Sequence, residues 1–304
     1  MKRDFIALSD YTSEELAQLL DLADSMKAQP ERYTDSLRGR TLGMIFNKRS
    51  TRTRISFEVG MFQLGGLGLF FSPNDTQLAR GETIADTARV LSRYLDAVMI
   101  RTFAHTEVLE FARHASIPVI NGLTDFNHPC QAMADLMTLK ERFGHLEGLK
   151  LAYLGDANNV AVSLLNACVK FGLHMAVVSP EGYTLPPEVI AAAQPEAEAR
   201  GVSLQFTPHP EEGIKGADAV YTDTWTSMGQ EAEHDRRVRD LAPYQVNEQM
   251  MALAKPQAVF MHCLPAHRGE EVTDAVMDGP ASAVWDQAEN RLHFQKALLY
   301  HLLG

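Results

Sequence analysis

Short apolar runs alternate with amphipathic stretches along the whole chain. The runs hold four to six residues, which suits buried strands. We expect strands at 41–46, 67–71, 96–100, 117–120, 149–154, 174–178, 202–206, 218–222, 257–261 and 282–285. Between and after these runs, apolar residues recur at helical spacing. We expect helices at 53–64, 82–95, 106–115, 129–142, 159–171, 187–200, 247–254 and 286–302.

One further helix has a recognisable start before the first strand. Thr12 and Glu15 form the capping-box pattern, in which each side chain accepts a hydrogen bond from the other residue's backbone N–H. Leu16, Leu19 and Leu20 then share one helical face. The pattern predicts an amphipathic helix that begins near residue 12.

Strands and helices in alternation are typical of an α/β protein whose parallel sheets are covered on both faces. Ten strands suit two sheets, and Phe143-Gly144-His145 offers a break between them. We therefore predict two doubly wound domains, each a mostly parallel sheet flanked by helices, at 1–144 and 145–304. The last helix, about 286–304, could pack back on the first domain.

The chain is acidic, because 28 Lys and Arg residues face 39 Asp and Glu residues and give a net charge of −11. This charge argues against general binding to nucleic acid or to anionic membranes, but not against a small anion in a local basic pocket. Three cysteines without a C-x-x-C pair indicate reduced thiols and a cytoplasmic protein. The sequence shows neither an apolar run of membrane-spanning length nor a signal-peptide pattern.

The densest chemical signal is the segment 47–54, Asn-Lys-Arg-Ser-Thr-Arg-Thr-Arg. It follows a predicted strand and opens a predicted helix, whose free N–H groups and positive dipole end favour an anion. Arg52 can donate to two oxygens at once. The segment predicts a phosphate or carboxylate site, and the alternative is a solvated basic helix start capped by Ser50. The P-loop pattern is missing from the sequence, so ATP is not implied.

His128-Pro129-Cys130-Gln131 stands where the helix at 129–142 is expected to begin. Pro129 suits the first helical position, which places His128 and Gln131 about one turn apart. Imidazole and amide N–H groups can both donate to a carbonyl group. The alternative is a capped helix with an incidental histidine.

Two loops in the second half follow predicted strands and carry polar residues. Gly155-Asp156-Ala157-Asn158-Asn159 lies where open α/β sheets bind ligands, but it lacks the glycine spacing and the acidic ribose partner of dinucleotide sites. Asn159 could hold a small polar ligand, or the segment could simply cap a helix. The second loop is the segment 223–229, which follows the strand expected at 218–222. There, Asp223 could pair with an ammonium group and Ser227 with a carboxylate. An ordinary strand-end loop is the alternative.

The segment His262-Cys263-Leu264-Pro265-Ala266-His267-Arg268 follows the strand expected at 257–261. His262, Cys263 and His267 suggest zinc, but the sequence offers no fourth ligand nearby and the spacing matches no familiar zinc pattern, so we expect no metal. A thiol at a strand end could instead contact substrate. Arg291, in the last predicted helix, is a further candidate anion contact.

Taken together, these segments resemble the aspartate/ornithine carbamoyltransferase family, in the family's order and over essentially the whole chain. Ser-Thr-Arg-Thr-Arg at 50–54 and His-Pro-x-Gln at 128–131 are shared across that family. Asp223-x-x-x-Ser227-Met228-Gly229 and His262-Cys263-Leu264-Pro265 look like the members that use ornithine. The departures are small: Asn47 stands where an acidic residue is common, and Ala157 is at a variable position.

The resemblance implies a role for individual residues. Carbamoyl phosphate would be bound by Ser50, Thr51, Arg52, Thr53, Gln77, Arg101, His128, Pro129, Cys130, Gln131, Cys263, Leu264 and Arg291. The amino-acid end of ornithine would be held by Asn159, Asp223, Ser227 and Met228. The catalytic residues would be Arg52, Arg101, His128 and Cys263. Gln77 matches a residue that such enzymes donate to a neighbouring subunit's site.

The resemblance also implies a reaction and an assembly. The carbamoyl group of carbamoyl phosphate would pass to the δ-amine of L-ornithine, giving citrulline and phosphate, as part of arginine biosynthesis. Carbamoyl phosphate would bind mainly through residues 1–144 and ornithine through residues 145–304. We expect a homotrimer with sites shared between subunits, and neither cofactor nor metal.

Three alternatives stay open at this point. A carbamoyltransferase for putrescine or acetylornithine would share most of the motifs, but putrescine has no carboxylate and acetylornithine has no α-ammonium group for Asp223. A non-catalytic binding protein should have lost a catalytic residue, and the expected positions are all occupied. A nucleotide-dependent oxidoreductase should carry the glycine fingerprint, which the sequence lacks.

Overall fold

The computed structural model describes residues 2–72 and 81–304. The chain divides into two compact units, the first formed by residues 1–137 with 289–304 and the second by residues 138–288. The predicted α/β fold with two parallel sheets is confirmed. The assignment of one ligand each to residues 1–144 and 145–304 stays a prediction.

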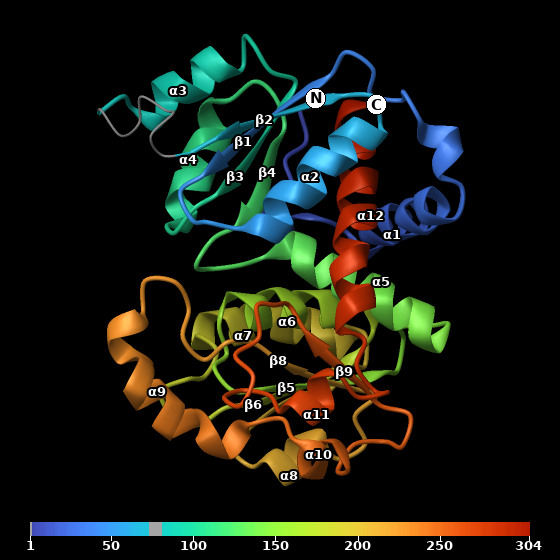
Figure 1. Ribbon diagram of the computed structural model, residues 1–304, viewed down its shortest axis with the longest axis vertical. Helices are drawn as coiled ribbons and strands as arrows, with labels where there is room; N and C mark the ends of the chain where they lie inside the picture. The colour runs from blue at the N-terminus through green and yellow to red at the C-terminus, as the bar shows by residue number, and fades with distance from the viewer. Residues whose placement is uncertain (1, 73–80) are drawn as a thin grey trace. The chain divides into compact units, whose positions relative to one another are not determined.

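The first unit contains a four-stranded parallel sheet in the order β2-β1-β3-β4 (Figure 1). Its strands are β1 (Thr41–Phe46), β2 (Leu67–Phe71), β3 (Ala97–Arg101) and β4 (Val119–Leu123). The N-terminal segment covers the β4 edge, because Phe5 N–H donates to Val119 O and Asn121 N–H donates to Phe5 O, both at 2.8 Å. The opposite edge, β2, stays partly exposed.

Helices pack around this sheet. They are α1 (Ser13–Ala28), α2 (Thr51–Gln63), α3 (Ile84–Leu91), α4 (His105–His114), α5 (Pro129–Phe143) and α12 (Val284–Leu303), with short 3-10 helices at Leu8–Asp10 and Pro30–Tyr33. The predicted capping box of α1 is confirmed, since Thr12 Oγ1 accepts from Glu15 N–H at 3.2 Å and Glu15 Oε2 accepts from Thr12 N–H at 2.8 Å.

The helix α12 lies against α2 in the first unit (Figure 1). Gly60 makes this close approach possible, because side-chain atoms of Lys296, Leu292 and Leu299 lie 3.4–3.7 Å from where a Cβ on Gly60 would stand. The same helix also contacts the N-terminal segment, because the Phe294 ring packs on the Phe5 ring with 5.8 Å between their centroids. The C-terminal helix is therefore part of the first unit's core.

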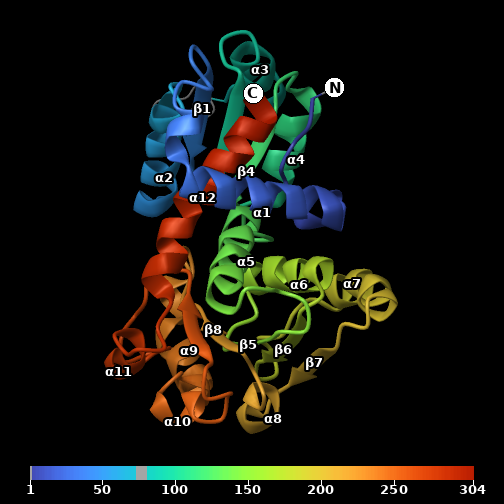
Figure 2. The same ribbon diagram turned by 90° about the vertical axis from the view of Figure 1, so that its right-hand side faces the viewer.

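The second unit contains a five-stranded parallel sheet in the order β7-β6-β5-β8-β9. Its strands are β5 (Lys150–Leu154), β6 (His174–Val178), β7 (Leu204–Thr207), β8 (Ala219–Thr222) and β9 (Val259–His262). Its helices are α6 (Asn159–Phe171), α7 (Pro187–Ala199), α8 (Pro210–Ile214), α9 (His234–Leu241), α10 (Glu248–Met251) and α11 (Asp274–Met277), with 3-10 helices at Glu231–Glu233 and Ala242–Tyr244. Figure 2 shows α6 and α7 side by side.

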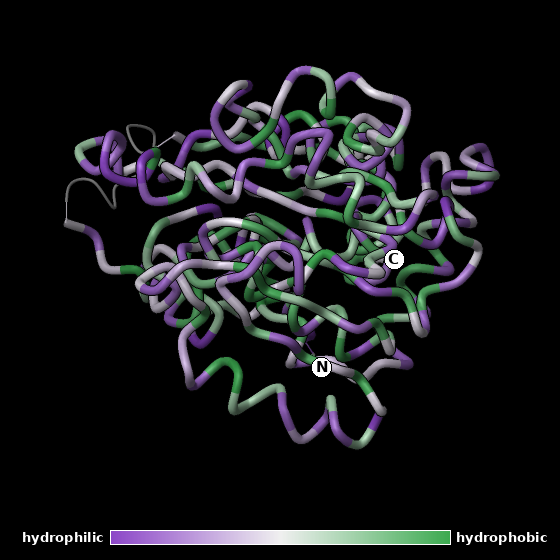
Figure 3. The backbone as a smooth tube through the Cα atoms, turned by 90° about the horizontal axis from the view of Figure 1, so that it is seen from below, coloured by the Kyte–Doolittle hydropathy of each residue, from purple (hydrophilic) through white to green (hydrophobic). Residues whose placement is uncertain are grey.

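Each sheet has its own apolar core. In the first unit, β1, β3 and β4 supply buried Ile45, Val98 and Val119. In the second unit, the sheet packs around Trp225 and Phe260, which are almost completely buried. Along single helices, apolar and polar segments alternate (Figure 3), as expected when one face of a helix is buried. Within residues 2–72 and 81–304, every helix is too short or too polar to cross a membrane.

The prediction of a strand at 282–285 is wrong. Ser282 forms only an isolated bridge with Phe260, and α12 already begins at Val284. Ala283 and Val284 are buried at that helix start, and a short apolar run at a buried helix start resembles a strand. The helix expected at 247–254 is also shorter, spanning Glu248–Met251.

Candidate functional site

The carboxyl ends of three neighbouring strands gather the candidate residues of the first unit. In the sheet order, β1 lies beside β3 and β3 beside β4. Because parallel strands end at the same edge, the segment 47–53 after β1 lies near Arg101, the last residue of β3. The segment that leads from β4 to His128 starts at the same edge. Residues far apart in the sequence thus meet at one place.

The first element of this site is the start of α2. Ser50 is the N-cap, and its Oγ accepts from the Thr53 N–H at 3.2 Å. The N-cap bond leaves the other N–H groups of the first turn unused by the helix. Because the N-terminal dipole end is positive, this turn is suited to bind a phosphate oxygen. Ser50 therefore caps the helix, as expected for a solvated basic helix start, and it also lies within the predicted anion site.

The second element is a pair of buried cations. Arg101 is 7% exposed and Lys48 is 6% exposed. The Arg101 Nε donates to the backbone oxygen of Lys48 at 3.2 Å, which fixes the guanidinium against the β1–α2 connection. The Lys48 Nζ forms an ion pair with Asp125 at 2.9 Å and lies over the Phe103 ring. Two cations are thus held in the interior beside the start of α2.

The third element joins α12 to α2 and α5. Arg291 is buried, and its guanidinium donates to Gln131 Oε1 at 2.6 Å and to Thr53 Oγ1 at 3.2 Å. Gln131 in turn donates to Asp135 Oδ1 at 2.8 Å. The structure therefore brings Thr53, Gln131 and Arg291 into one hydrogen-bonded group, although they lie up to 238 residues apart.

His128 lies at the centre of this positive group. Its side chain is buried. Burial, followed by the cations Arg291, Arg101, Arg52 and Lys48, holds the pKa of the His128 imidazole well below its usual range. The histidine is consequently neutral near pH 7, and it can donate one N–H to an acceptor while its cationic neighbours attract negative charge.

Pro129 and Cys130, the two residues that follow His128, are both buried. Cys130 is fully buried, and its thiol donates to the Asn121 backbone oxygen at 3.7 Å. Burial raises the pKa of Cys130 to about 12. Pro129 begins α5, as predicted. Any ligand contact of Cys130 would therefore come from its backbone.

In the second unit, the carboxyl ends of β5, β8 and β9 are also neighbours. Asp223, directly after β8, is the centre of this second group. Its Oδ2 accepts from Asn158 Nδ2 at 2.7 Å, and its Oδ1 accepts from the Thr224 N–H at 2.7 Å and from the Cys263 thiol at 2.9 Å. The predicted residues Asp223 and Cys263 are thus in direct contact.

Asn158, which was not predicted as a ligand contact, links α6 to this group. It is the N-cap of α6, with its Oδ1 accepting from the Val160 N–H at 2.9 Å. Asn159, the residue predicted to bind ornithine, is the first residue of α6. Asn158 therefore caps the helix and orients Asp223, which leaves Asn159 as the candidate for ligand contact.

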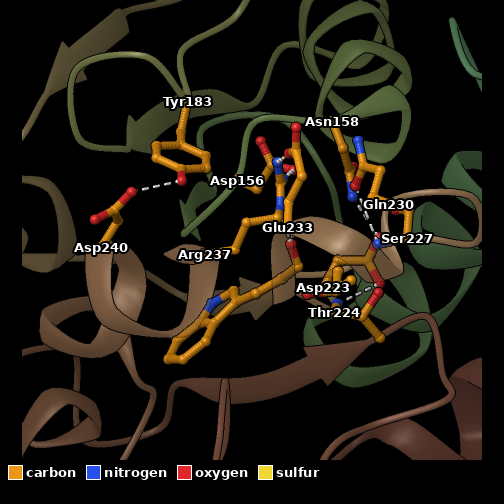
Figure 4. A network of polar contacts seen from close by, with 12 residues as sticks. Asp156, Asn158, Tyr183, Asp223, Thr224, Ser227, Gln230, Glu233, Arg237 and Asp240 are labelled. Atoms are coloured by element: carbon orange, nitrogen blue, oxygen red, sulfur yellow. Dashed lines mark hydrogen bonds and ion pairs between the residues drawn. The ribbon is translucent and has the colours of Figure 1, made fainter. Parts of the chain in front are cut away.

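A buried arginine supports the loop that carries Ser227. Arg237 of α9 is 7% exposed and donates to the Trp225 backbone oxygen and to the Asp156 carboxylate. Figure 4 shows Arg237 reaching between Asp156 and Glu233. Burial raises the pKa of Asp156 to about 6, against the opposing effect of Arg237. Arg237 thus ties the loop after β5 to the loop after β8.

The remaining predicted ornithine contacts lie further along the same loop. The Ser227 N–H donates to Gln230 Oε1 at 3.1 Å (Figure 4), and Met228 is 42% exposed. Gly229 follows with a φ of +96°, a conformation that favours glycine. The loop from Asp223 to Gly229 is therefore held at its start and turned sharply at its end.

The segment after β9 contains an unusual backbone conformation. Leu264 has a φ of +59°, which L-residues with large side chains rarely adopt. Asp223, His262 and Cys263 place potential metal-binding atoms within 4.8 Å of one another. However, both imidazole nitrogens of His262 have partners within the protein, the Leu264 N–H at 2.8 Å and Glu271 Oε1 at 3.2 Å.

Gln77, predicted to reach a neighbouring subunit, lies outside the described residues. Lys48, Asn158 and Arg237 were not predicted as site residues. Lys48 belongs to the basic segment 47–54, whereas Arg237 is surrounded by charged residues that look like an exposed helix face.

Comparison with known proteins places both halves of the chain in one family. Residues 3–141 match the carbamoyl-phosphate-binding domain of the aspartate/ornithine carbamoyltransferases, and residues 147–302 match the Asp/Orn-binding domain of the same family. A protein of Oceanobacillus iheyensis named ornithine carbamoyltransferase is 55% identical, with 99% of this chain and 94% of that protein covered. One from Thermococcus kodakarensis with the same name is 54% identical, with 99% and 96% covered.

Solved structures agree with these matches. The ornithine carbamoyltransferase from Pyrococcus furiosus has a TM-score of 0.96 and 53% identity, with 99% of this chain and 97% of that chain covered. The enzyme from Thermus thermophilus has a TM-score of 0.90 and 42% identity over 100% of both chains. The resemblance predicted from the Ser50–Arg54 and His128–Gln131 segments is confirmed. The chain belongs to the aspartate/ornithine carbamoyltransferase family.

Proposed function

We propose that the protein is an ornithine carbamoyltransferase, which transfers the carbamoyl group of carbamoyl phosphate to the δ-amine of L-ornithine and releases L-citrulline and phosphate. The observation that carries this proposal is the group of cations that surrounds a neutral His128 and includes Arg52 in the first turn of α2. The cations in this group can bind a phosphate, and the neutral imidazole can donate an N–H hydrogen bond to a carbonyl oxygen. The relatives named for this activity support the same function.

Carbamoyl phosphate has an anionic end and a carbonyl end, and the first unit has groups for both. We assign the phosphate to the start of α2, with Arg101 and Arg291 as further cations. We assign the carbamoyl group to Arg101, His128 and Gln131. The residues proposed for this ligand are Ser50, Thr51, Arg52, Thr53, Gln77, Arg101, His128, Pro129, Cys130, Gln131, Cys263, Leu264 and Arg291.

Ornithine needs an acidic partner for its α-ammonium group and N–H or O–H donors for its α-carboxylate. Asp223 supplies the carboxylate, and it is held by Asn158 and Thr224. Ser227 and the Met228 backbone are our candidates for the α-carboxylate, with Asn159 as a further polar contact. An ammonium partner at Asp223 favours ornithine over acetylornithine, whose α-nitrogen carries no charge.

The reaction balances with groups that the chain and its substrates supply. The neutral δ-amine attacks the carbonyl carbon, so an N–C bond forms while the carbonyl oxygen becomes negative. Arg52, Arg101 and His128 stabilise this oxyanion by donating to it. The C–O bond to phosphate then breaks, and the leaving phosphate takes the proton from nitrogen. Positioning of two bound reactants provides much of the rate acceleration.

We further propose a homotrimer of the cytoplasm that acts in arginine biosynthesis. Four large apolar side chains on α2 and β2 support an oligomer, since they are 37–80% exposed in the single chain: Ile55, Phe62, Leu67 and Leu69. An exposed apolar group of this kind is typical of a subunit interface. Sedimentation equilibrium measures the assembly, and a monomer at micromolar concentration would contradict this part of the proposal.

A substrate panel tests the proposed activity. Citrulline formation is measured with ornithine, and carbamoyl transfer with putrescine, acetylornithine and aspartate at equal concentrations. We expect ornithine to have the highest kcat/KM by orders of magnitude. A preference for another amine would retain the family and replace the substrate. The absence of transfer to any amine would favour a binding protein without catalytic activity.

A further inference from the structure

The segment that carries Cys263 and Leu264 is held by a buried pair of side chains, His262 and Glu271. We propose that His262 and Glu271 are positioning residues of the reaction: together they fix the backbone of Leu264 and the direction of the Cys263 thiol. This inference rests on the proposed function, because it assumes that Cys263 and Leu264 contact the reacting groups.

The first contact lies within the segment itself. His262 Nδ1 accepts from the Leu264 N–H at 2.8 Å. This bond closes a short turn that contains the thiol-bearing Cys263 and ends at the left-handed Leu264, whose φ is +59°. The left-handed backbone conformation is sterically unfavourable for a residue with a large side chain such as leucine. The hydrogen bond to His262 therefore supports a conformation that Leu264 would not adopt by itself.

The second contact fixes the imidazole. His262 Nε2 lies 3.2 Å from Glu271 Oε1, and both side chains are completely buried. Because Nδ1 accepts a hydrogen bond, it carries no proton, so Nε2 must carry the single proton and donate to the carboxylate. Glu271 thus selects one tautomer of a neutral histidine. A change to the other tautomer would break both hydrogen bonds at once.

Glu271 also fixes the far end of the segment. The same Oε1 accepts from the His267 N–H at 2.5 Å. The segment 262–267 is therefore anchored to one buried carboxylate at its first and its last residue. Its start is anchored a second time, because the His262 N–H donates to Gln287 Oε1 at 2.9 Å, and Gln287 donates to Tyr221 OH at 3.1 Å.

These anchors act on the proposed ligand contacts through the backbone. Cys263 lies between His262 and Leu264, and its thiol donates to Asp223 at 2.9 Å. If the turn closed by His262 opened, both Cys263 and Leu264 would move. A misplacement of about 1 Å can cost on the order of 100-fold in rate. The phosphate contacts proposed for the first unit belong to other segments and do not depend on this turn.

Two substitutions separate the contacts. His262→Leu removes both side-chain hydrogen bonds. His262→Asn retains a side-chain acceptor for the N–H two residues on, which is the usual Asx-turn, while losing the contact with Glu271. His267→Asn is the matched control, because it makes the same chemical change five residues away at an exposed side chain whose backbone N–H stays in place.

We expect His262→Leu to lower kcat by about 100-fold while the Kd for carbamoyl phosphate, measured by calorimetry, rises by a much smaller factor, because most of the contacts proposed for that ligand lie in the first unit. His262→Asn should recover about tenfold of that loss, and His267→Asn should behave as wild type within about twofold. The inference is wrong if His262→Leu retains its kcat, if kcat and carbamoyl phosphate affinity fall together, or if Asn recovers nothing.

A measurement on the wild type covers the case in which His262→Leu does not fold. Histidine-labelled protein is observed by ¹⁵N NMR, and we expect His262 to show an unprotonated Nδ1 and a protonated Nε2. The opposite tautomer or a doubly protonated ring would overturn the inference. If the wild type formed no citrulline, the proposed function would fail, and the tautomer would still decide whether Glu271 fixes His262.

Discussion

The buried His128 should make the stability of the protein depend on pH in a defined way. Burial and four nearby cations lower its pKa in the folded state. A histidine in the unfolded chain has a pKa of about 6.5. As the pH falls through that value, the unfolded chain binds a proton at His128 and the folded chain does not. The contribution of His128 to the free energy of unfolding is therefore retained above about pH 6.5 and lost below it.

The size of the effect follows from proton linkage. If folded His128 stays neutral at pH 5.5, the free energy of unfolding falls by about 1.3 kcal/mol between pH 7.5 and pH 5.5 because of this one group. His128→Gln retains a polar side chain that does not titrate. Over the same pH range, the free energy of unfolding of the variant should therefore fall by about 1.3 kcal/mol less than that of the wild type. The other histidines contribute equally to both proteins and cancel in this difference.

The assay is urea unfolding of both proteins at fixed concentration and at several pH values between 5.5 and 7.5. The buffers must be free of phosphate, because a bound phosphate would compensate Arg52, Arg101 and Arg291 and raise the His128 pKa. Adding phosphate should therefore reduce the difference between the two proteins. Equal pH dependence of wild type and variant, or an NMR pKa of His128 at or above 6.5, would refute the electrostatic account.

Three further predictions concern the proposed site. Arg52→Ala should weaken carbamoyl phosphate binding by about 2–5 kcal/mol in a calorimetric titration, because it removes a two-pronged anion contact, while Arg49→Ala at an exposed neighbouring position should not. Asp223→Asn should lower kcat/KM for ornithine by up to about 10⁴-fold with carbamoyl phosphate affinity retained; an unchanged value would remove Asp223 from the ornithine site. Dialysis against a chelator should leave activity intact, because both nitrogens of His262 already have protein partners; loss of activity that zinc restores would contradict this.

The sequence predicted well those features that depend on local patterns. The strands β1, β2 and β6 lie at the predicted residues, because each is a continuous apolar run between polar segments. The capping box at Thr12 is likewise a local pattern. The sheet order was not predictable in this way, yet it brings Arg101 beside the start of α2.

Residues whose role depends on distant partners were missed. Arg237 lies among charged residues that look like an exposed helix face, but it is buried against the Trp225 carbonyl, 12 residues away, and Asp156, 81 residues away. Asn158 and Asn159 are adjacent and chemically identical, so only the helix start decides that Asn158 is the cap and orients Asp223. The local sequence indicated that the segment 155–159 could cap a helix, but it did not indicate which asparagine does so or that Arg237 is buried.

The place of α12 in the first unit has a consequence for the synthesis of the protein. A ribosome that has made residues 1–137 has not yet supplied Phe294 and Leu298, which are fully buried in that unit, or Arg291, which completes the group with Thr53 and Gln131. The second unit is made before the first can close. The anion site therefore becomes complete only after nearly the entire chain has been translated, and a nascent chain that stops before α12 should expose apolar surface to chaperones.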